Sequence, residues 1–353
     1  MKTKGFVEIR TGVSRLALAL VVAIPLATAL PAAAAIDGRW IVEFEDGGKE
    51  RVQLTTKRSK SGRGNWTNSS SYPPEAFRGL VRPAGTSALP ARFELARDAG
   101  TVTFEGQLDA SGGAGRFSFA PNAEFGREME RMGYSGLTEE NLFTMAMHDI
   151  GRAFIGGLRE LGYSRLSFDD LVSMRIHGAT PAFIRELAAL GYEKLPADDL
   201  VSMRIHGAVP SYIREMRELG YERLSSDELV SMRIHGATPE FVRAFSALGY
   251  ERLPGDDLVS MRIHHVTPEF VRELKALGYS DVSTDDLVSM RIHNVTTEFV
   301  RDLKELGFQD VSVDDLVSMR IHNVTADFAR KVKSRDPNVT VDELVSMRIH
   351  RRG

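Results

Sequence analysis

The chain has 353 residues, a formal net charge of −3 and no cysteine. The lack of cysteine excludes disulfide bonds and argues against a cysteine-linked lipid anchor, so stability must come from packing. The slightly acidic balance argues against nucleic acid as a partner, because phosphate binding requires clustered lysine and arginine in excess.

Residues 1–35 have the pattern of a secretory signal peptide. Four basic residues precede an apolar run at 16–30, and Ala33 and Ala35 fit cleavage before Ile36. The run is short for a membrane span, which needs about 20 residues, although an uncleaved anchor is an alternative. We therefore expect a periplasmic or secreted protein with no transmembrane span after cleavage.

Residues 36–120 alternate between apolar and polar side chains, which predicts a small antiparallel β domain. Segments 40–44 and 51–54 flank Asp46-Gly-Gly48 and indicate a hairpin, and segments 92–96, 101–105 and 116–119 indicate a three-stranded meander. The Ser-, Gly- and Asn-rich stretch 58–74 between them is expected to be an exposed loop. A sheet of this size has a thin core, so we expect it to pack against the first helical unit.

From residue 121 to residue 353 the sequence is a repeat. The pentapeptide Ser-Met-Arg-Ile-His occurs seven times, at steps of 29 residues except for a last step of 28. A fixed period of this length is typical of stacked supersecondary units. The expected fold class is therefore α+β, mainly α, with the small β domain followed by an α-α helical-repeat solenoid.

One unit can be constructed from its residue types. Ser167 is expected to cap a first helix with acidic residues in its first turn, and Gly178 to end it in the left-handed conformation. His265, Asn294 and Asn323 occupy the position of Gly178 in later units, and these types tolerate positive φ. Leu171, Val172, Met174 and Ile176 are expected to form the apolar arc of this helix.

A second helix is expected to begin at Thr180 with Pro181 in its first turn and to end at Gly191-Tyr192. Equivalent Gly-Tyr or Gly-Phe pairs place a half unit near residues 123–132, and the last unit is shortened through residues 335–338. These counts predict about sixteen short helices in a rod or shallow arc.

Two rows of residues are candidates for binding. On a helical wheel Arg175 falls inside the apolar arc, so its charge must be paired or bonded to carbonyl groups. We expect it to bond the acidic pair of a neighbouring unit or the carbonyl end of the second helix, as a clamp between units; a ligand-binding row is the alternative. The candidate rows are Arg175, Arg204, Arg233, Arg262, Arg291 and Arg320, and His177, His206, His235, His264, His293 and His322.

We assign no catalytic residue, metal or cofactor. Asp169, Ser173 and His177 share a helix edge, but a serine inside a helix lacks the sharp turn and the oxyanion hole of a hydrolase. Equivalent histidines lie about one helix-packing distance apart, roughly 8–10 Å, which is too far to share one metal ion.

The repeat resembles known sequences. Residues 256–279, which hold Asp-Asp-Leu-Val-Ser-Met-Arg-Ile-His and Pro-Glu-Phe-Val-Arg-Glu-Leu-Lys-Ala-Leu-Gly-Tyr, look like helical repeats of bacterial envelope proteins. Some of those repeats follow membrane metallopeptidases of the beta-lactam-sensor/antirepressor type, and residues 97–106 are similar to the segment before such repeats. The resemblance covers about residues 92–353. The zinc motif and transmembrane bundle of those peptidases are missing here, so it implies an extracytoplasmic sensing or docking module.

The expected function is therefore a non-enzymatic extracytoplasmic scaffold or sensor module that binds a protein, peptide or polymer partner. A self-associating structural component of the envelope is the alternative. A hydrolase with its site in the β domain is a third hypothesis.

Overall fold

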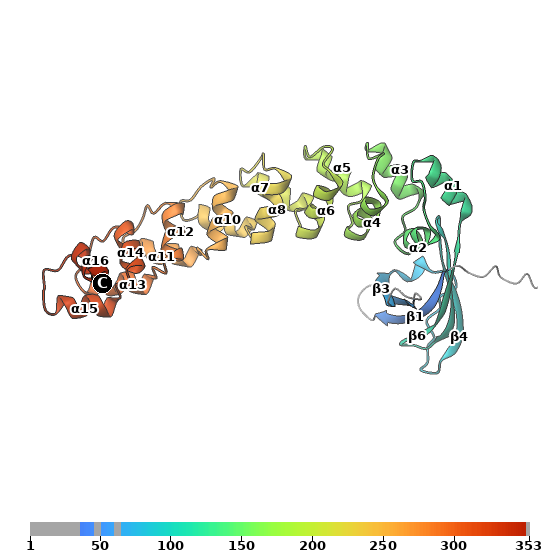
Figure 1. The fold of residues 1–353 in the computed structure, drawn as a ribbon, viewed down its shortest axis with the longest axis horizontal. Helices are drawn as coiled ribbons and strands as arrows, with labels where there is room; N and C mark the ends of the chain where they lie inside the picture. Colours follow the sequence, from blue (N-terminus) through green and yellow to red (C-terminus); the bar gives the residue numbers. More distant parts are fainter. Residues whose placement is uncertain (1–35, 46–50, 60–64, 351–353) are drawn as a thin grey trace, which may run out of the picture.

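The computed structural model describes residues 36–45, 51–59 and 65–350. The expected signal peptide and the Asp46-Gly-Gly48 turn lie outside these residues. The described chain forms a six-stranded sheet followed by sixteen helices (Figure 1), which confirms the α+β, mainly α, class.

The sheet is antiparallel throughout, in the order β3-β2-β1-β6-β5-β4. A single turn of 3-10 helix, Pro74–Ala76, follows its third strand. The strands are β1 (Ile36–Glu45), β2 (Arg51–Ser59), β3 (Asn65–Tyr72), β4 (Leu89–Arg97), β5 (Gly100–Leu108) and β6 (Gly112–Pro121).

One strand contradicts the sequence prediction. We expected a loop over 58–74, but residues 65–72 form the edge strand β3. Its hydroxyl groups bond polar side chains of β2: Arg51 Nε donates to Ser71 Oγ at 2.7 Å, and Gln53 Nε2 to Ser69 Oγ at 2.9 Å. A strand that exposes one face to water can therefore be built from residues typical of loops.

The helices alternate between two kinds, and all of those described are too short to cross a membrane. First helices carry the Ser-Met-Arg-Ile-His sequence or its equivalent: α2 (Glu139–Met147), α4 (Phe168–His177), α6 (Ala197–His206), α8 (Ser226–His235), α10 (Gly255–Ile263), α12 (Thr284–Ile292), α14 (Val313–Ile321) and α16 (Val341–His350). Second helices are α1 (Ala123–Arg131), α3 (Arg152–Glu160), α5 (Pro181–Ala189), α7 (Pro210–Glu218), α9 (Pro239–Ser246), α11 (Pro268–Ala276), α13 (Thr297–Glu305) and α15 (Ala326–Lys333).

Helix ends follow the sequence signals. Ser167 caps α4 and exchanges bonds with Asp170 in a capping box, while Gly178 ends the helix at φ 75°. Thr180 caps α5, with Pro181 at its start. His265, Asn294 and Asn323 have φ between 56° and 59°, so these residues terminate helices as expected.

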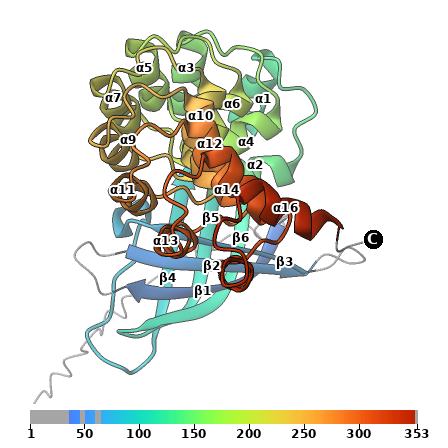
Figure 2. The same ribbon diagram turned by 90° about the vertical axis from the view of Figure 1, so that its left-hand side faces the viewer.

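The array is curved (Figures 1 and 2). Neighbouring first helices pack more extensively against each other than neighbouring second helices do. Seen along the array, second helices follow the outer curve and first helices the inner one (Figure 2). The side formed by first helices is therefore the concave side.

Helix α2 joins the array to the sheet. Its Phe143 stacks on Phe117 of β6 with ring centroids 5.6 Å apart, among the buried aromatic side chains of the sheet's inner side. The Tyr72 hydroxyl donates to the Met147 carbonyl at 2.8 Å. As expected, the small sheet completes its core on the first unit.

Tyrosines at the ends of second helices link each unit to the next. The hydroxyl of each donates to a carbonyl 32 residues further along the chain, at 2.6–2.8 Å. The pairs are Tyr163–Leu195, Tyr192–Leu224, Tyr221–Leu253, Tyr250–Val282 and Tyr279–Val311.

Removing one of these bonds should be measurable. Tyr221→Phe leaves the Leu253 carbonyl without its donor, and should lower the free energy of unfolding by about 1 kcal/mol in urea titrations. Tyr134→Phe is the matched control, because the buried Tyr134 hydroxyl has no hydrogen-bond partner in the described part of the chain; it should leave stability unchanged or slightly higher. Equal losses in the two variants would contradict the assigned role.

Candidate functional site

The arginine row lies between successive units. In α6 the guanidinium carbon of Arg204 is 5.0 Å from the ring centroid of Phe183, which belongs to the second helix of the preceding unit. Arg204 Nε donates to the carbonyl of His177, in the last turn of the preceding first helix, at 3.3 Å. One side chain thus contacts both helices of its neighbour, and this is the geometry of a clamp.

Our expectation for the arginine's partner was wrong in detail. The carbonyl belongs to the preceding first helix, not to the second helix. The second residue of the acidic pair instead serves the cap, since Asp170 accepts from the Ser167 backbone N–H at 2.8 Å. Within the described row, Arg175 is the one arginine that pairs with a carboxylate. Its partner is Asp149 of the first unit, at 2.8 Å.

The hydrogen bond of each arginine differs with the residue that ends the preceding first helix. An added Cβ at Gly207 would lie 3.0 Å from Arg233 Nη2, so glycine here leaves room for the guanidinium. After glycine caps, Nε bonds the histidine carbonyl at 3.3–3.4 Å. After His265, Asn294 and Asn323, Nε is buried in Arg291, Arg320 and Arg348 without a partner among the described residues. After Asp149, which also carries a side chain, Arg175 Nε bonds the His148 carbonyl at 2.9 Å.

These last three arginines still stack on rings of the preceding unit. Their guanidinium carbons lie 5.2, 5.1 and 4.3 Å from the ring centroids of Phe270, Phe299 and Phe328, respectively. The cation–π contact is therefore common to the whole row, and the carbonyl bond is confined to the units that follow a glycine or Asp149.

The histidine row lies at the carboxyl ends of the first helices, where its members are exposed or half-exposed. A partial positive charge stabilises this end of a helix. In the described residues no group of three or more His, Asp or Glu is placed to hold a metal ion. The structure thus brings the arginines to the joints between units and the histidines to one edge of the array.

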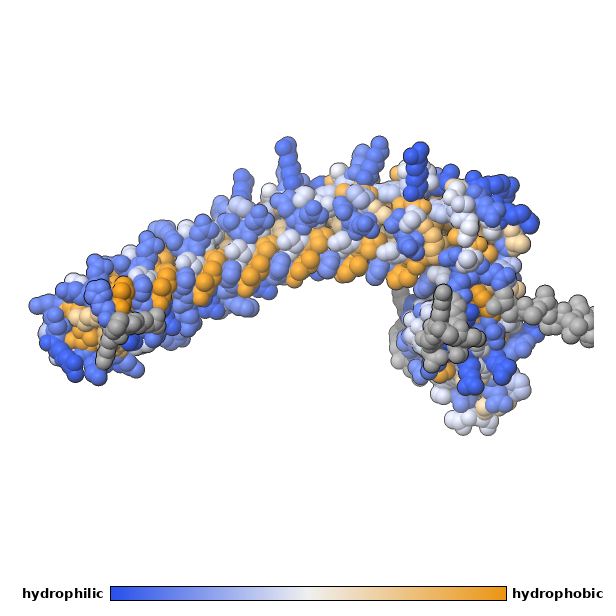
Figure 3. All heavy atoms as spheres, in the orientation of Figure 1, coloured by the Kyte–Doolittle hydropathy of each residue, from blue (hydrophilic) through white to orange (hydrophobic). Residues whose placement is uncertain are grey.

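The sequence analysis predicted the wrong environment for the isoleucine that precedes each histidine. We expected Ile176 in the arc that faces the core, but Leu171 and Met174 are buried and Ile176 is 51% exposed. The seven equivalents are all 45–54% exposed: Ile176, Ile205, Ile234, Ile263, Ile292, Ile321 and Ile349. Figure 3 shows apolar side chains in a row along the side of the array that the first helices form.

Each isoleucine has regular neighbours. An exposed aspartate stands seven residues before it, almost two helical turns, and a valine stands four residues before it. In α4 these residues are Asp169, Val172 and Ile176. We call this strip and its equivalents in the other units the inner face. It is an apolar row bordered by aspartates at the amino ends of the helices and by histidines at the carboxyl ends.

The inner face varies less between units than the rest of the array. Leu-Val-Ser-Met-Arg-Ile-His is identical in all seven units, including its exposed isoleucine. An exposed position of the second helices differs between units: Ala182, Ser211, Glu240, Glu269, Glu298 and Asp327. Folding does not require a β-branched apolar residue at an exposed helix position, where its propensity is moderate. One exposed position of the second helices is also identical, the arginine at 185, 214, 243, 272, 301 and 330, but it is charged. The isoleucine is the apolar residue that is kept at an exposed position.

Comparison of the sequence with models of protein families gives no match, and comparison with curated proteins gives none either. The site therefore has to be interpreted from its own geometry.

The effect of the cap on the clamp can be tested with a double-mutant cycle. Gly207→Asn keeps a residue that tolerates positive φ but adds a Cβ against Arg233, so it should lower the free energy of unfolding by about 1 kcal/mol. In an Arg233→Met background the same substitution should lower the free energy of unfolding by clearly less. Denaturant titrations of the four proteins give the coupling; additive effects would show that the cap does not act through the arginine.

Proposed function

We propose that the protein is a non-enzymatic interaction scaffold that acts outside the cytoplasm and binds an elongated protein partner along its inner face. The observation that carries the proposal is the row of seven identical, exposed isoleucines, in an array whose outer helices differ from unit to unit at most exposed positions. A row of exposed apolar side chains is typical of an interaction surface.

The spacing and charge of the inner face favour one kind of partner. Packed helices lie about 8–10 Å apart, and a helix advances about 10.5 Å in seven residues. A partner helix that lies along the array can therefore place one apolar residue of each heptad beside each unit. The aspartate border favours basic residues next to that apolar stripe.

The extracytoplasmic part of the proposal rests on the sequence. Residues 1–35 have the order of a signal peptide, and the repeat resembles those of bacterial envelope proteins. The arginine row supports the scaffold indirectly, because its stacking and carbonyl bonds hold the units in register behind the inner face.

Paired variants test this function. Ile234→Ser combined with Ile263→Ser changes the inner face, and Glu240→Ser combined with Glu269→Ser is the control on the outer helices. All four residues are exposed, so both variants should fold normally. The wild-type and control proteins should capture the same proteins from envelope extract. The inner-face variant should bind its partner about 30- to 150-fold more weakly, because two isoleucines buried in the complex contribute on the order of 2–3 kcal/mol.

Sedimentation of the three purified proteins accompanies the capture experiment. Identical capture by all three proteins would contradict the proposal. A dimer of the wild type that the inner-face variant does not form would overturn it as well, because the inner face would then bind a second copy of the chain.

A further inference from the structure

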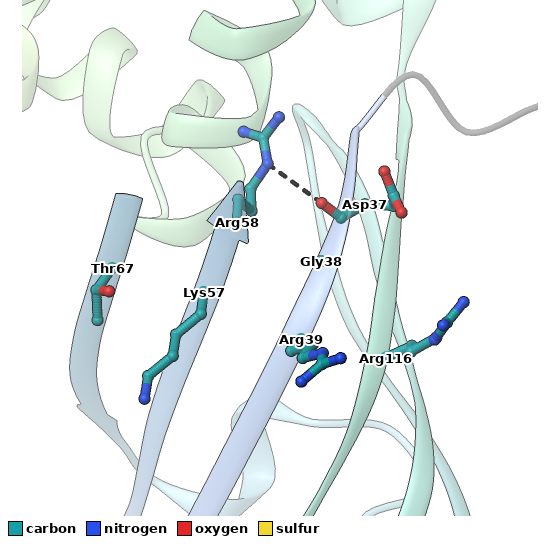
Figure 4. A pocket seen from close by; sticks show the side chains of 7 residues that line it. All are labelled: Asp37, Gly38, Arg39, Lys57, Arg58, Thr67 and Arg116. Carbon is teal, nitrogen blue, oxygen red and sulfur yellow. Dashed lines mark hydrogen bonds between the residues drawn. The ribbon is translucent and has the colours of Figure 1, made fainter. Parts of the chain in front are cut away.

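A separate cluster of charges lies on the outer side of the sheet, the side opposite its aromatic core. The strand register places Arg39 of β1 opposite Lys57 of β2 on one side and opposite Arg116 of β6 on the other. Thr67 of β3 continues the row. The three cations and the threonine line a hollow together with Asp37, Gly38 and Arg58 (Figure 4).

These three cations are unusual among the basic residues of the sheet. All three are exposed, and none makes a hydrogen bond or ion pair with another described residue. The next residue along the row, Glu105, is engaged by Arg92 at 2.9 Å. The neighbouring Arg58, by contrast, bonds the Asp37 carbonyl at 3.3 Å and Glu140 at 2.6 Å.

A row of like charges on paired strands lowers the stability of the sheet. Side chains directly opposite each other on adjacent strands lie about 4.5–5.5 Å apart at Cβ, and like charges there destabilise the sheet. Placing three such cations together contributes nothing to the core beneath them, which consists of apolar side chains such as Trp40 and Phe117. The row is therefore better explained by an anion that neutralises it.

The geometry of the row defines the anion. Two neighbouring guanidinium groups can share the three oxygens of one phosphate, whereas a carboxylate offers two oxygens and a single charge. Lys57 then lies about one strand spacing, roughly 4.8 Å, from Arg39 on the other side and can take a second charge. Thr67 adds a hydroxyl that can donate to the same ligand.

We propose that Lys57, Arg39 and Arg116 form a binding site for a linear anion that carries adjacent phosphate groups. Arg39 and Arg116 take one phosphate, and Lys57 takes the next. This site is independent of the inner face, because it lies on the sheet and uses none of the array's residues.

The test measures binding and melting temperature of the full chain at low ionic strength. The probes are tripolyphosphate, orthophosphate and tricarballylate, a tricarboxylate of similar length. Tripolyphosphate should bind at least about tenfold more tightly than either of the others, since successive charges engage successive cations. It should also raise the melting temperature of the protein.

Two variants assign the effect to the row. Arg39→Gln combined with Arg116→Gln should abolish tripolyphosphate binding. Arg51→Gln removes one charge from the other end of β2, outside the row. This variant should still bind tripolyphosphate. In the absence of anion the double variant should melt at the same temperature as the wild type or higher, because it relieves repulsion between like charges.

Several outcomes would overturn the proposal. These are no binding of tripolyphosphate by the wild type, equal binding of tricarballylate, or unchanged binding by the double variant. A lower melting temperature of the double variant without anion would show that the arginines stabilise the sheet and would remove the argument from repulsion.

Discussion

Every unit of the array depends on the contact with its predecessor. Two helices of eight to ten residues cannot bury their apolar sides alone, and isolated helices of this length are marginal in water. The stacked arginine provides the recurring contact: its guanidinium covers a ring of the preceding second helix in each unit from Arg175 to Arg348. It helps to fix the orientation of each unit relative to its predecessor.

This contact also determines which residues face the solvent. With Leu171 and Met174 in the core and Arg175 directed toward the preceding unit, the remaining side of the first helix carries Asp169, Val172 and Ile176. Repetition then turns one partly apolar helix side into a continuous strip. The inner face is thus a product of the stacking, and the close packing of first helices places it on the concave side.

The cap residue divides the array into two parts. After Asp149 and after glycine at 178, 207 and 236, the next arginine bonds a carbonyl through Nε, whereas after His265, Asn294 and Asn323 Nε lacks that partner. The later units therefore retain the cation–π contact but lack one hydrogen bond. We expect the carboxyl-terminal units to open more readily than the central ones, since local stability follows such contacts.

Local signals were enough to predict the helices, because caps and glycine ends depend on residues close in sequence. Ser167, Thr180 and Gly178 have the roles that their types indicate. The partners of Arg204 and Tyr192 could not be predicted, because they lie 27 and 32 residues away and depend on how units stack. Strand β3 was missed because hydroxyl-rich edge strands resemble loops in composition.

The exposed isoleucines were misplaced for a related reason. A helical wheel gives an apolar arc, but the width of the arc that is covered depends on the neighbouring helices. Ile176 lies at the edge of that arc and remains uncovered. Identity across the seven units does not separate Ile176 from the buried Leu171 and Met174, which are repeated as strictly. The cation row on the sheet could not be predicted from the sequence, because β1 and β6 are distant in sequence and pair only in the fold.

Site-specific photo-crosslinking tests the central claim most directly. A photoreactive amino acid would replace Ile205, Ile234 or Ile263 on the inner face, or Ala182, Ser211 or Glu240 on the outer helices, in cells that express the full chain. The account predicts that the three inner positions crosslink to one common protein partner and that the outer positions do not. Crosslinks of equal strength from the outer positions, or none from the inner positions, would contradict it.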